Sequence, residues 1–208
     1  LVQSDIAYYN YHGRHYFYKF QKFEAIFPVF MEYLWIISNK KSNINIFNDF
    51  RNKSISIGTK GTGSRLNAID VLSEAGLEDG IDFYGISISK KKSIDGLLSG
   101  SIDAAIFTSR SIPKELQNSH HDLRFHALPN GLINKLKSRN PYYIKTNPEI
   151  FNKINIQTIG IKSILIGRKD LSGGDVETIV KTLIRFDEIL SSKEDLINFL
   201  KVKEIPIN

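Results

Sequence analysis

Cysteine is absent from these 208 residues. Disulfide bridges, thiolate metal sites and cysteine nucleophiles are therefore excluded, whereas the redox state of the compartment stays open. Long apolar runs are absent too, because the most hydrophobic stretch, at 33–37, has the length of a strand and not the roughly 20 residues that span a bilayer. The sequence predicts a folded protein with no transmembrane helix.

Catalytic and metal-binding patterns are also scarce. The five histidines show no paired metal-ligand spacing, and no Gly-x-Ser-x-Gly nucleophile elbow occurs. Carboxylates are plentiful, but a sequence does not show which of them meet in space, so acid–base chemistry stays open as an alternative. We predict a protein that is not an enzyme and that needs no metal and no cofactor.

The charge balance is positive. Lys and Arg number 28 against 22 Asp and Glu, which gives a net charge of +6 and favours anionic ligands or acidic surfaces. The tightest basic run, Lys90-Lys91-Lys92, comes just before a predicted helix, and we interpret it as a solvated loop. The charge therefore indicates a small anionic ligand and no nucleic-acid partner.

The first fifty residues predict a mixture of short elements. Gly13 ends a first helix, and Pro28 separates two strands rich in aromatic and β-branched residues. The aromatic residues among the first twenty, up to Phe20, are interpreted as core, with stacking on a ligand as the alternative. The expected elements are a helix at 5–11, strands at 23–27 and 32–38, and a short helix at 46–50.

A regular alternation of strands and helices begins near residue 54. Leu66, Ile69 and Leu72 recur at helical spacing, and Gly76 is a plausible terminator of that helix. Such alternation predicts right-handed crossovers and a largely parallel sheet. The remaining expected elements here are strands at 54–58, 83–87, 102–108 and 123–128 and helices at 93–98 and 132–137.

The last part of the chain begins with a connector at 140–155, which contains proline and asparagine and is a candidate crossing between domains. A strand at 159–166 and a helix at 176–190 follow, and Ser191 begins a capping box with Glu194. The helix carries a stripe of apolar side chains: Ile179, Val180, Leu183, Ile184 and Phe186.

The most informative segment runs from Gly58 to Arg65, between a predicted strand and a predicted helix. Its glycines permit a tight turn, and the unpaired N–H groups of the helix start, with the hydroxyls of Thr62 and Ser64, can hold a carboxylate or a phosphate. A P-loop needs Lys where Ser64 stands, and the dinucleotide fingerprint needs Gly where Leu66 stands. The alternative is a plain turn in which Ser64 only caps the helix.

Four motifs together resemble the TAXI family of TRAP-transporter solute receptors, and also the bacterial surface antigens of that family called immunogenic proteins. The similarity runs over nearly the whole chain. The motifs are Leu1-Val2-Gln3-Ser4-Asp5-Ile6-Ala7, Gly58-x-x-Gly61-Thr62-Gly63-Ser64-x-x-Asn67-Ala68, Gly100-x-Ile102-Asp103-Ala104-Ala105 and Pro141-Tyr142-Tyr143.

This resemblance implies an α/β fold, the two-lobed periplasmic binding protein of type II, with the ligand in the cleft between the lobes. Residues 1–52 and 156–208 would form lobe I, and residues 53–155 would form lobe II. The resemblance implies that the following residues contact the solute: Gln3, Asp5, Gly61, Thr62, Gly63, Ser64, Asn67, Thr108, Tyr142 and Tyr143.

The implied function is that of a periplasmic receptor. It would capture a small carboxylate such as glutamate, glutamine or a related organic acid and deliver it, as a monomer, to the membrane subunit of a TRAP transporter. Two other functions stay open, namely the effector-binding domain of a transcriptional regulator and an enzyme on the same scaffold.

This sequence departs from the family in two places. Gly61-Thr62-Gly63-Ser64 exchanges the two hydroxyl residues of the usual Gly-Ser-Gly-Thr order. The family also begins with a Gly-rich strand and a further helix before the Val-Gln-Ser-Asp segment, and neither precedes Val2 here, so we expect a fragment or a processed form.

Overall fold

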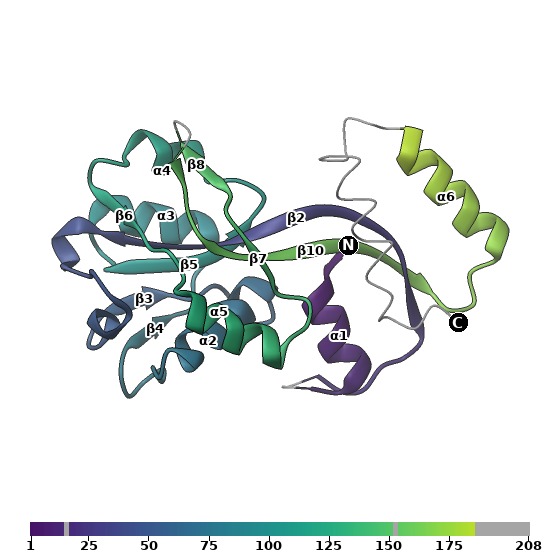
Figure 1. Ribbon diagram of the computed structural model, residues 1–208, viewed down its shortest axis with the longest axis horizontal. Coiled ribbons are helices and arrows are strands. Elements are labelled where there is room, and N and C mark those ends of the chain that lie inside the picture. The colour runs from purple at the N-terminus through teal and green to yellow at the C-terminus, as the bar shows by residue number, and fades with distance from the viewer. Residues whose placement is uncertain (15–16, 152–153, 186–208) are drawn as a thin grey trace. The chain divides into compact units, whose positions relative to one another are not determined.

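The computed structural model describes residues 1–14, 17–151 and 154–185, and these residues form two compact units (Figure 1). Among these described residues, unit 1 contains those of 1–32 and 161–185, and unit 2 contains those of 33–160. The chain passes from one unit to the other inside two long strands, β2 (Phe23–Asn39) and β10 (Thr158–Arg168). The predicted lobe boundaries, at 52 and 155, differ from these, and the division into solute-binding lobes stays a prediction.

Unit 2 contains the predicted parallel strands. β3 (Ser54–Ser56) pairs in parallel with both β4 (Tyr84–Ile86) and β5 (Ala104–Ser109), which confirms the parallel arrangement expected there. The part of β2 that lies in unit 2 adds to β5 in antiparallel register, from Tyr33 opposite Ser109 to Ser38 opposite Ala104. The sheet of unit 2 is therefore mixed, with a parallel centre.

Shorter strands complete the described β-structure of unit 2. β6 pairs with the end of β2, β7 pairs with the start of β10, and β8 and β9 form a separate antiparallel pair within the predicted connector. Their bounds are β6 (Leu123–Phe125), β7 (Ile144–Thr146), β8 (Glu149–Phe151) and β9 (Ile154–Asn155).

The helices of unit 2 alternate with its strands along the sequence. They are α2 (Gly63–Glu74), α3 (Lys90–Ser99), α4 (Lys114–Asn118) and α5 (Asn130–Arg139), with 3-10 turns at η1 (Lys40–Ser42) and η2 (Phe47–Phe50). Gly76, with φ of 75°, follows the C-cap of α2 as expected. The prediction of a loop at 90–92 is wrong, because the Ser89 hydroxyl accepts the N–H of Lys92 and so starts α3 at Lys90.

The core of unit 2 lies between its sheet and its helices. Trp35 and Ile37 of β2, Leu97 of α3 and Phe107 of β5 belong to one cluster of buried apolar side chains. Asp103 fixes the two parallel strand starts, because its carboxylate accepts both the N–H and the hydroxyl of Ser54 at 2.8 Å. The Gly100–Ala105 motif therefore has a structural role in joining β5 to β3.

Unit 1 contains β1 (Val2–Gln3), α1 (Ser4–His12), the first part of β2, the second part of β10 and α6 (Gly173–Arg185). β1 pairs antiparallel with β10, and α1 ends at Gly13 in the left-handed conformation, as predicted. A small cluster of Ala7, Phe23 and Ile164 holds α1 to the strands.

The strand prediction at Pro28 is wrong, because β2 continues through this proline without a break. The strands β5 and β6 pair with β2 only from Tyr33 onward, so among the described strands one side of Pro28 lies at a sheet edge. Proline is tolerated at an edge because no ladder hydrogen bond is needed from its nitrogen there.

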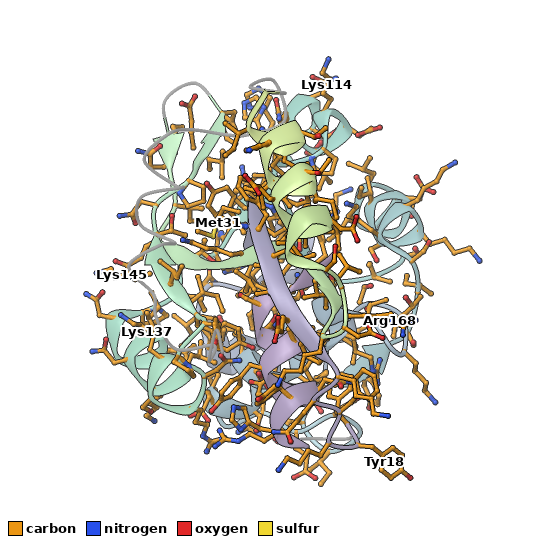
Figure 2. The ribbon with its side chains drawn as sticks, turned by 90° about the vertical axis from the view of Figure 1, so that its right-hand side faces the viewer. Tyr18, Met31, Lys114, Lys137, Lys145 and Arg168 are labelled. Atoms are coloured by element: carbon orange, nitrogen blue, oxygen red, sulfur yellow. The ribbon has the colours of Figure 1, made fainter. Side chains whose placement is uncertain are left out.

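Exposed aromatic side chains follow α1. Tyr18 is 94% exposed and points away from the ribbon in Figure 2, and Phe20 is also exposed, whereas Tyr9 is buried. The assignment of all early aromatic residues to the core is therefore wrong in part. The predicted helix end at 186–190, including Phe186, and the capping box of Ser191 and Glu194 lie outside the described residues.

Candidate functional site

The candidate site is the turn between β3 and α2, at the carboxyl end of a parallel strand. Gly58 and Gly61 have φ angles of 82° and 80°, in the left-handed region that favours glycine. A Cβ atom added to Gly58 would lie 3.2 Å from the backbone nitrogen of Arg65. Gly58 is therefore needed both for the turn and for the close approach of the chain to the first turn of α2.

Thr62, and not Ser64, caps the helix. The Thr62 hydroxyl accepts the N–H of Arg65 at 3.3 Å and donates to the carbonyl of Thr59 at 2.8 Å. The hydroxyl proton of Thr62 is thus used inside the loop, which leaves this side chain a poor donor to a ligand.

Ser64 lies instead beside the end of β5. Its hydroxyl accepts the backbone N–H of Thr108 at 3.1 Å and shares a hydrogen bond of 2.7 Å with the Thr108 hydroxyl. Only one of the two hydroxyls donates its proton in the contact between them. The structure therefore brings together Ser64 and Thr108, which are 44 positions apart in the sequence.

Two backbone donors lie in the same turn. Leu66 donates its N–H to the carbonyl of Thr62, but within the described residues neither Gly63 nor Ser64 has an acceptor for its N–H. The first turn of α2 also holds no acidic side chain. With the positive end of the helix dipole, this arrangement can bind one carboxylate or another small anion.

Asn67 and Tyr143 meet one turn further along α2. The Asn67 amide donates to the Tyr143 hydroxyl at 3.0 Å, and that hydroxyl donates to the Asp70 carboxylate at 2.5 Å. Asn67 and Tyr143 are both buried, with exposed fractions of 0% and 1%. The side chains of this pair thus point toward each other inside unit 2.

The other predicted contacts lie elsewhere. Gln3 and Asp5 belong to unit 1, where the Gln3 amide donates to Glu32 at 2.6 Å and the Asp5 carboxylate accepts the N–H of Ile6 at 2.8 Å. Tyr142 is half-buried in unit 2 and donates its N–H to the Asn140 side chain. These three residues stay predicted solute contacts.

Arg65 is a neighbour of the turn that sequence reasoning missed. Its guanidinium donates to the Gly58 carbonyl at 3.4 Å and lies 4.0 Å from the Asp79 carboxylate. The Ser87 hydroxyl donates to the same Gly58 carbonyl at 3.3 Å. A basic residue in the first turn of a helix is unfavourable for the dipole, and this mismatch was the signal for a tertiary role of Arg65.

His126 is a buried titratable group of unit 2 whose pKa is strongly perturbed. Its ring shares a hydrogen bond of 2.8 Å with the Ser38 hydroxyl. Burial, helped by the charge of Arg124 and opposed by that of Asp49, lowers the pKa of His126 to about 4. This histidine is therefore neutral near pH 7 and acts as a buried polar side chain of unit 2.

Residues 1–14, 17–151 and 154–185 contain neither a membrane-spanning helix nor a metal-binding group of side chains. No helix there is long and apolar enough to cross a membrane. No group of three or more His, Cys, Asp and Glu side chains in this part of the chain is placed to hold a metal ion.

Comparisons with known proteins give one family and a set of solved structures. The family model described as the NMT1-like family matches residues 1–198. No curated protein sequence matches the chain.

Among solved structures, the chain is similar to the alkanesulfonate-binding protein SsuA from Xanthomonas axonopodis pv. citri, with 18% identity and a TM-score of 0.50 over 87% of this chain and 53% of that one. It is also similar to the arginine-, lysine-, histidine-binding protein ArtJ from Geobacillus stearothermophilus, with 15% identity and a TM-score of 0.49 over 81% and 60%. The chain thus spans less than two thirds of their length. The first likeness shows the fold and confirms the predicted α/β class of the periplasmic binding proteins.

Proposed function

This chain belongs to the NMT1-like family, and from that premise we propose that it is the solute-binding receptor of a transport system. The observation that carries the proposal is the start of α2, where the N–H groups of Gly63 and Ser64 occur together with the Ser64–Thr108 hydroxyl pair. We infer that these groups bind an anion. The solute is a small carboxylate, such as glutamate, glutamine or a related organic acid.

The chemistry of the α2 start favours a carboxylate. A carboxylate has two oxygens, and two N–H groups in one helical turn can each donate to one of them. The hydroxyls of Ser64 and Thr108 lie next to these N–H groups and can supply a third polar contact. The Ser64 hydroxyl makes its hydrogen bonds to Thr108 and not to a general base that would activate it as a nucleophile. We therefore propose that the chain binds its solute without changing it.

The further contacts are proposed from the sequence resemblance. Gln3, Asp5 and Tyr142 remain candidate solute contacts in addition to the α2 start. The Gly61 and Gly63 positions contribute through their backbone, because a side chain would obstruct the approach of an anion.

The transport system is proposed to be a TRAP transporter of the TAXI type, with the chain acting as a monomer in the periplasm and delivering its solute to the membrane subunit. The sequence motifs support this assignment. The solved structure with the related fold is an alkanesulfonate-binding protein, and we propose a comparable small solute here.

Native mass spectrometry of gently purified protein tests the proposal. We expect a bound species with the mass of a small organic acid, which calorimetric titration of the stripped protein then confirms. The Ser64→Ala variant serves as the control and should lose most of that bound species. A protein that carries no small molecule and binds none of glutamate, glutamine and common organic acids would contradict the proposed function.

A further inference from the structure

The side chains of Asn67 and Tyr143, which the sequence resemblance implies as solute contacts, make hydrogen bonds to each other. Tyr143 is 1% exposed, and its hydroxyl both accepts from Asn67 and donates to Asp70. A phenol hydroxyl has one proton, and here that proton is already donated to a carboxylate. The Tyr143 hydroxyl therefore makes both of these hydrogen bonds to side chains of α2.

The two partners of Tyr143 lie on one face of α2. Asn67 and Asp70 are three positions apart, and residues at this spacing are neighbours on a helix surface. Asn67 is also one turn after Gly63, the residue that begins α2. The Tyr143 hydroxyl thus connects to the helix immediately behind the turn whose N–H groups form the anion site.

A local turn sets the position of Tyr143. The Asn140 side chain accepts the N–H of Tyr142 at 3.0 Å, and the Asn140 carbonyl accepts the N–H of Tyr143 at 3.2 Å. Asparagine followed by proline favours such a turn, and Asn140 is fully buried directly after α5. The turn sets the backbone position from which the buried Tyr143 side chain reaches α2.

A hydrogen bond to an ionised carboxylate is stronger than one between neutral groups. The contact of 2.5 Å between Tyr143 and Asp70 is of this kind, and the neutral contact to Asn67 supports it. Loss of the hydroxyl would leave the buried amide of Asn67 without this acceptor. The early turns of α2 therefore depend on a residue that follows α5.

We propose that Tyr143 is a positioning residue for the anion site: its hydroxyl fixes the early turns of α2, and so fixes the N–H groups of Gly63 and Ser64, without touching the solute. The part that concerns the solute rests on the proposed function. The part that concerns α2 does not.

Amide hydrogen exchange of the whole chain tests the positioning role without any ligand. We expect Tyr143→Phe to speed the exchange of the amides at 66–70 by about tenfold, because it removes a charge-assisted hydrogen bond, and to leave the amides of α3 unchanged. Tyr84→Phe, at an exposed tyrosine of β4, is the control and should change neither. Asp70→Asn, which keeps an acceptor but removes the charge, should give a smaller increase at 66–70.

Two exchange results would overturn the positioning role. One is unchanged exchange at 66–70 in Tyr143→Phe. The other is an equal increase in α2 and α3, which would mean that Tyr143 only supports the stability of the whole unit.

Titration with L-glutamate then measures the effect on the site. We expect Tyr143→Phe to weaken binding about tenfold, and its effect to be non-additive with that of Ser64→Ala, because both changes act on the same donors. Additive effects, or an unchanged affinity in Tyr143→Phe, would contradict the positioning role. If the unchanged protein does not bind glutamate, the proposed carboxylate fails, while the exchange experiment still decides the role of Tyr143.

Discussion

The described parts of the two units differ in how well their apolar side chains are covered. In unit 2, α3 buries Leu97 against Trp35 and Phe107, with little or no exposed surface on any of the three. In unit 1, α6 has an apolar stripe of the same helical spacing, yet none of residues 173–184 is buried. Periodicity therefore predicts a helix and its apolar face but does not identify what covers that face.

The largest expected effect lies in the unit 2 core. Leu97→Ala should lower the free energy of unfolding by about 2–5 kcal/mol, because Leu97 is fully buried and the change leaves a cavity. Leu98→Ala, in the same helix but 40% exposed, is the matched control and should cost less than about 1 kcal/mol. Urea unfolding measures the stability of both variants. Equal losses of unfolding free energy would contradict the view that α3 has one buried and one exposed face.

Acid should destabilise unit 2 through His126. The unfolded chain protonates this histidine near its ordinary pKa of 6.5, whereas the folded chain does so only near pH 4. The unfolded state therefore binds more protons between about pH 6.5 and pH 4, and stability is lost as the pH falls through this window, by roughly 3 kcal/mol.

Thermal melts across that pH window check the His126 prediction. His126→Gln keeps an amide near Ser38 and removes the titration, so its stability should fall less between pH 6.5 and pH 4. Parallel curves for this variant and the unchanged protein would assign the acid sensitivity to other groups, among which Asp49 and Asp103 both have lowered pKa values.

The sequence predicted those features of the fold that depend on neighbouring residues. Gly13 and Gly76 were predicted to follow helices, and both have the left-handed conformation at those places. Pro28 was misjudged because its effect depends on whether a neighbouring strand needs a hydrogen bond there, which is a tertiary property. The turn between β3 and α2 was predicted, since glycines between a strand and a helix are a local pattern, whereas the solute contacts at this turn stay a prediction.

The contacts within the site could not be predicted in the same way. Ser64 meets Thr108 across 44 positions, and Asn67 meets Tyr143 across 76 positions, so neither pair leaves a local pattern in the sequence. The choice between Thr62 and Ser64 as helix cap depended on where α2 begins, and helix boundaries are the least certain part of a sequence-based prediction.

A smaller effect is expected at the cap of α2. Thr62→Ala should lower the free energy of unfolding by about 1 kcal/mol, because the N–H of Arg65 loses its acceptor. Thr62→Ser keeps the hydroxyl and should lower the free energy of unfolding by only about 0.3 kcal/mol. Thermal melts distinguish the two, and equal stability of both variants would show that the cap contributes nothing.

The smallest effect is expected in α6. Ile179→Ala should change the free energy of unfolding by about 0.5 kcal/mol or less, because Ile179 is only half-buried and alanine is the better helix former. Ile133→Ala in α5 removes the same atoms from a fully buried position and should cost about 2–5 kcal/mol. A comparable loss at both positions would show that α6 is covered as well as α5.

The most direct test of the account is calorimetric titration of Ser64→Ala and Thr62→Ala with the carboxylate that native mass spectrometry identifies. We expect Ser64→Ala to weaken binding about tenfold to a hundredfold, since a hydrogen bond to a charged group is worth about 1.5–3 kcal/mol. Thr62→Ala should keep its affinity and lose only stability. Unchanged affinity in Ser64→Ala would contradict the claim that the start of α2 holds the solute.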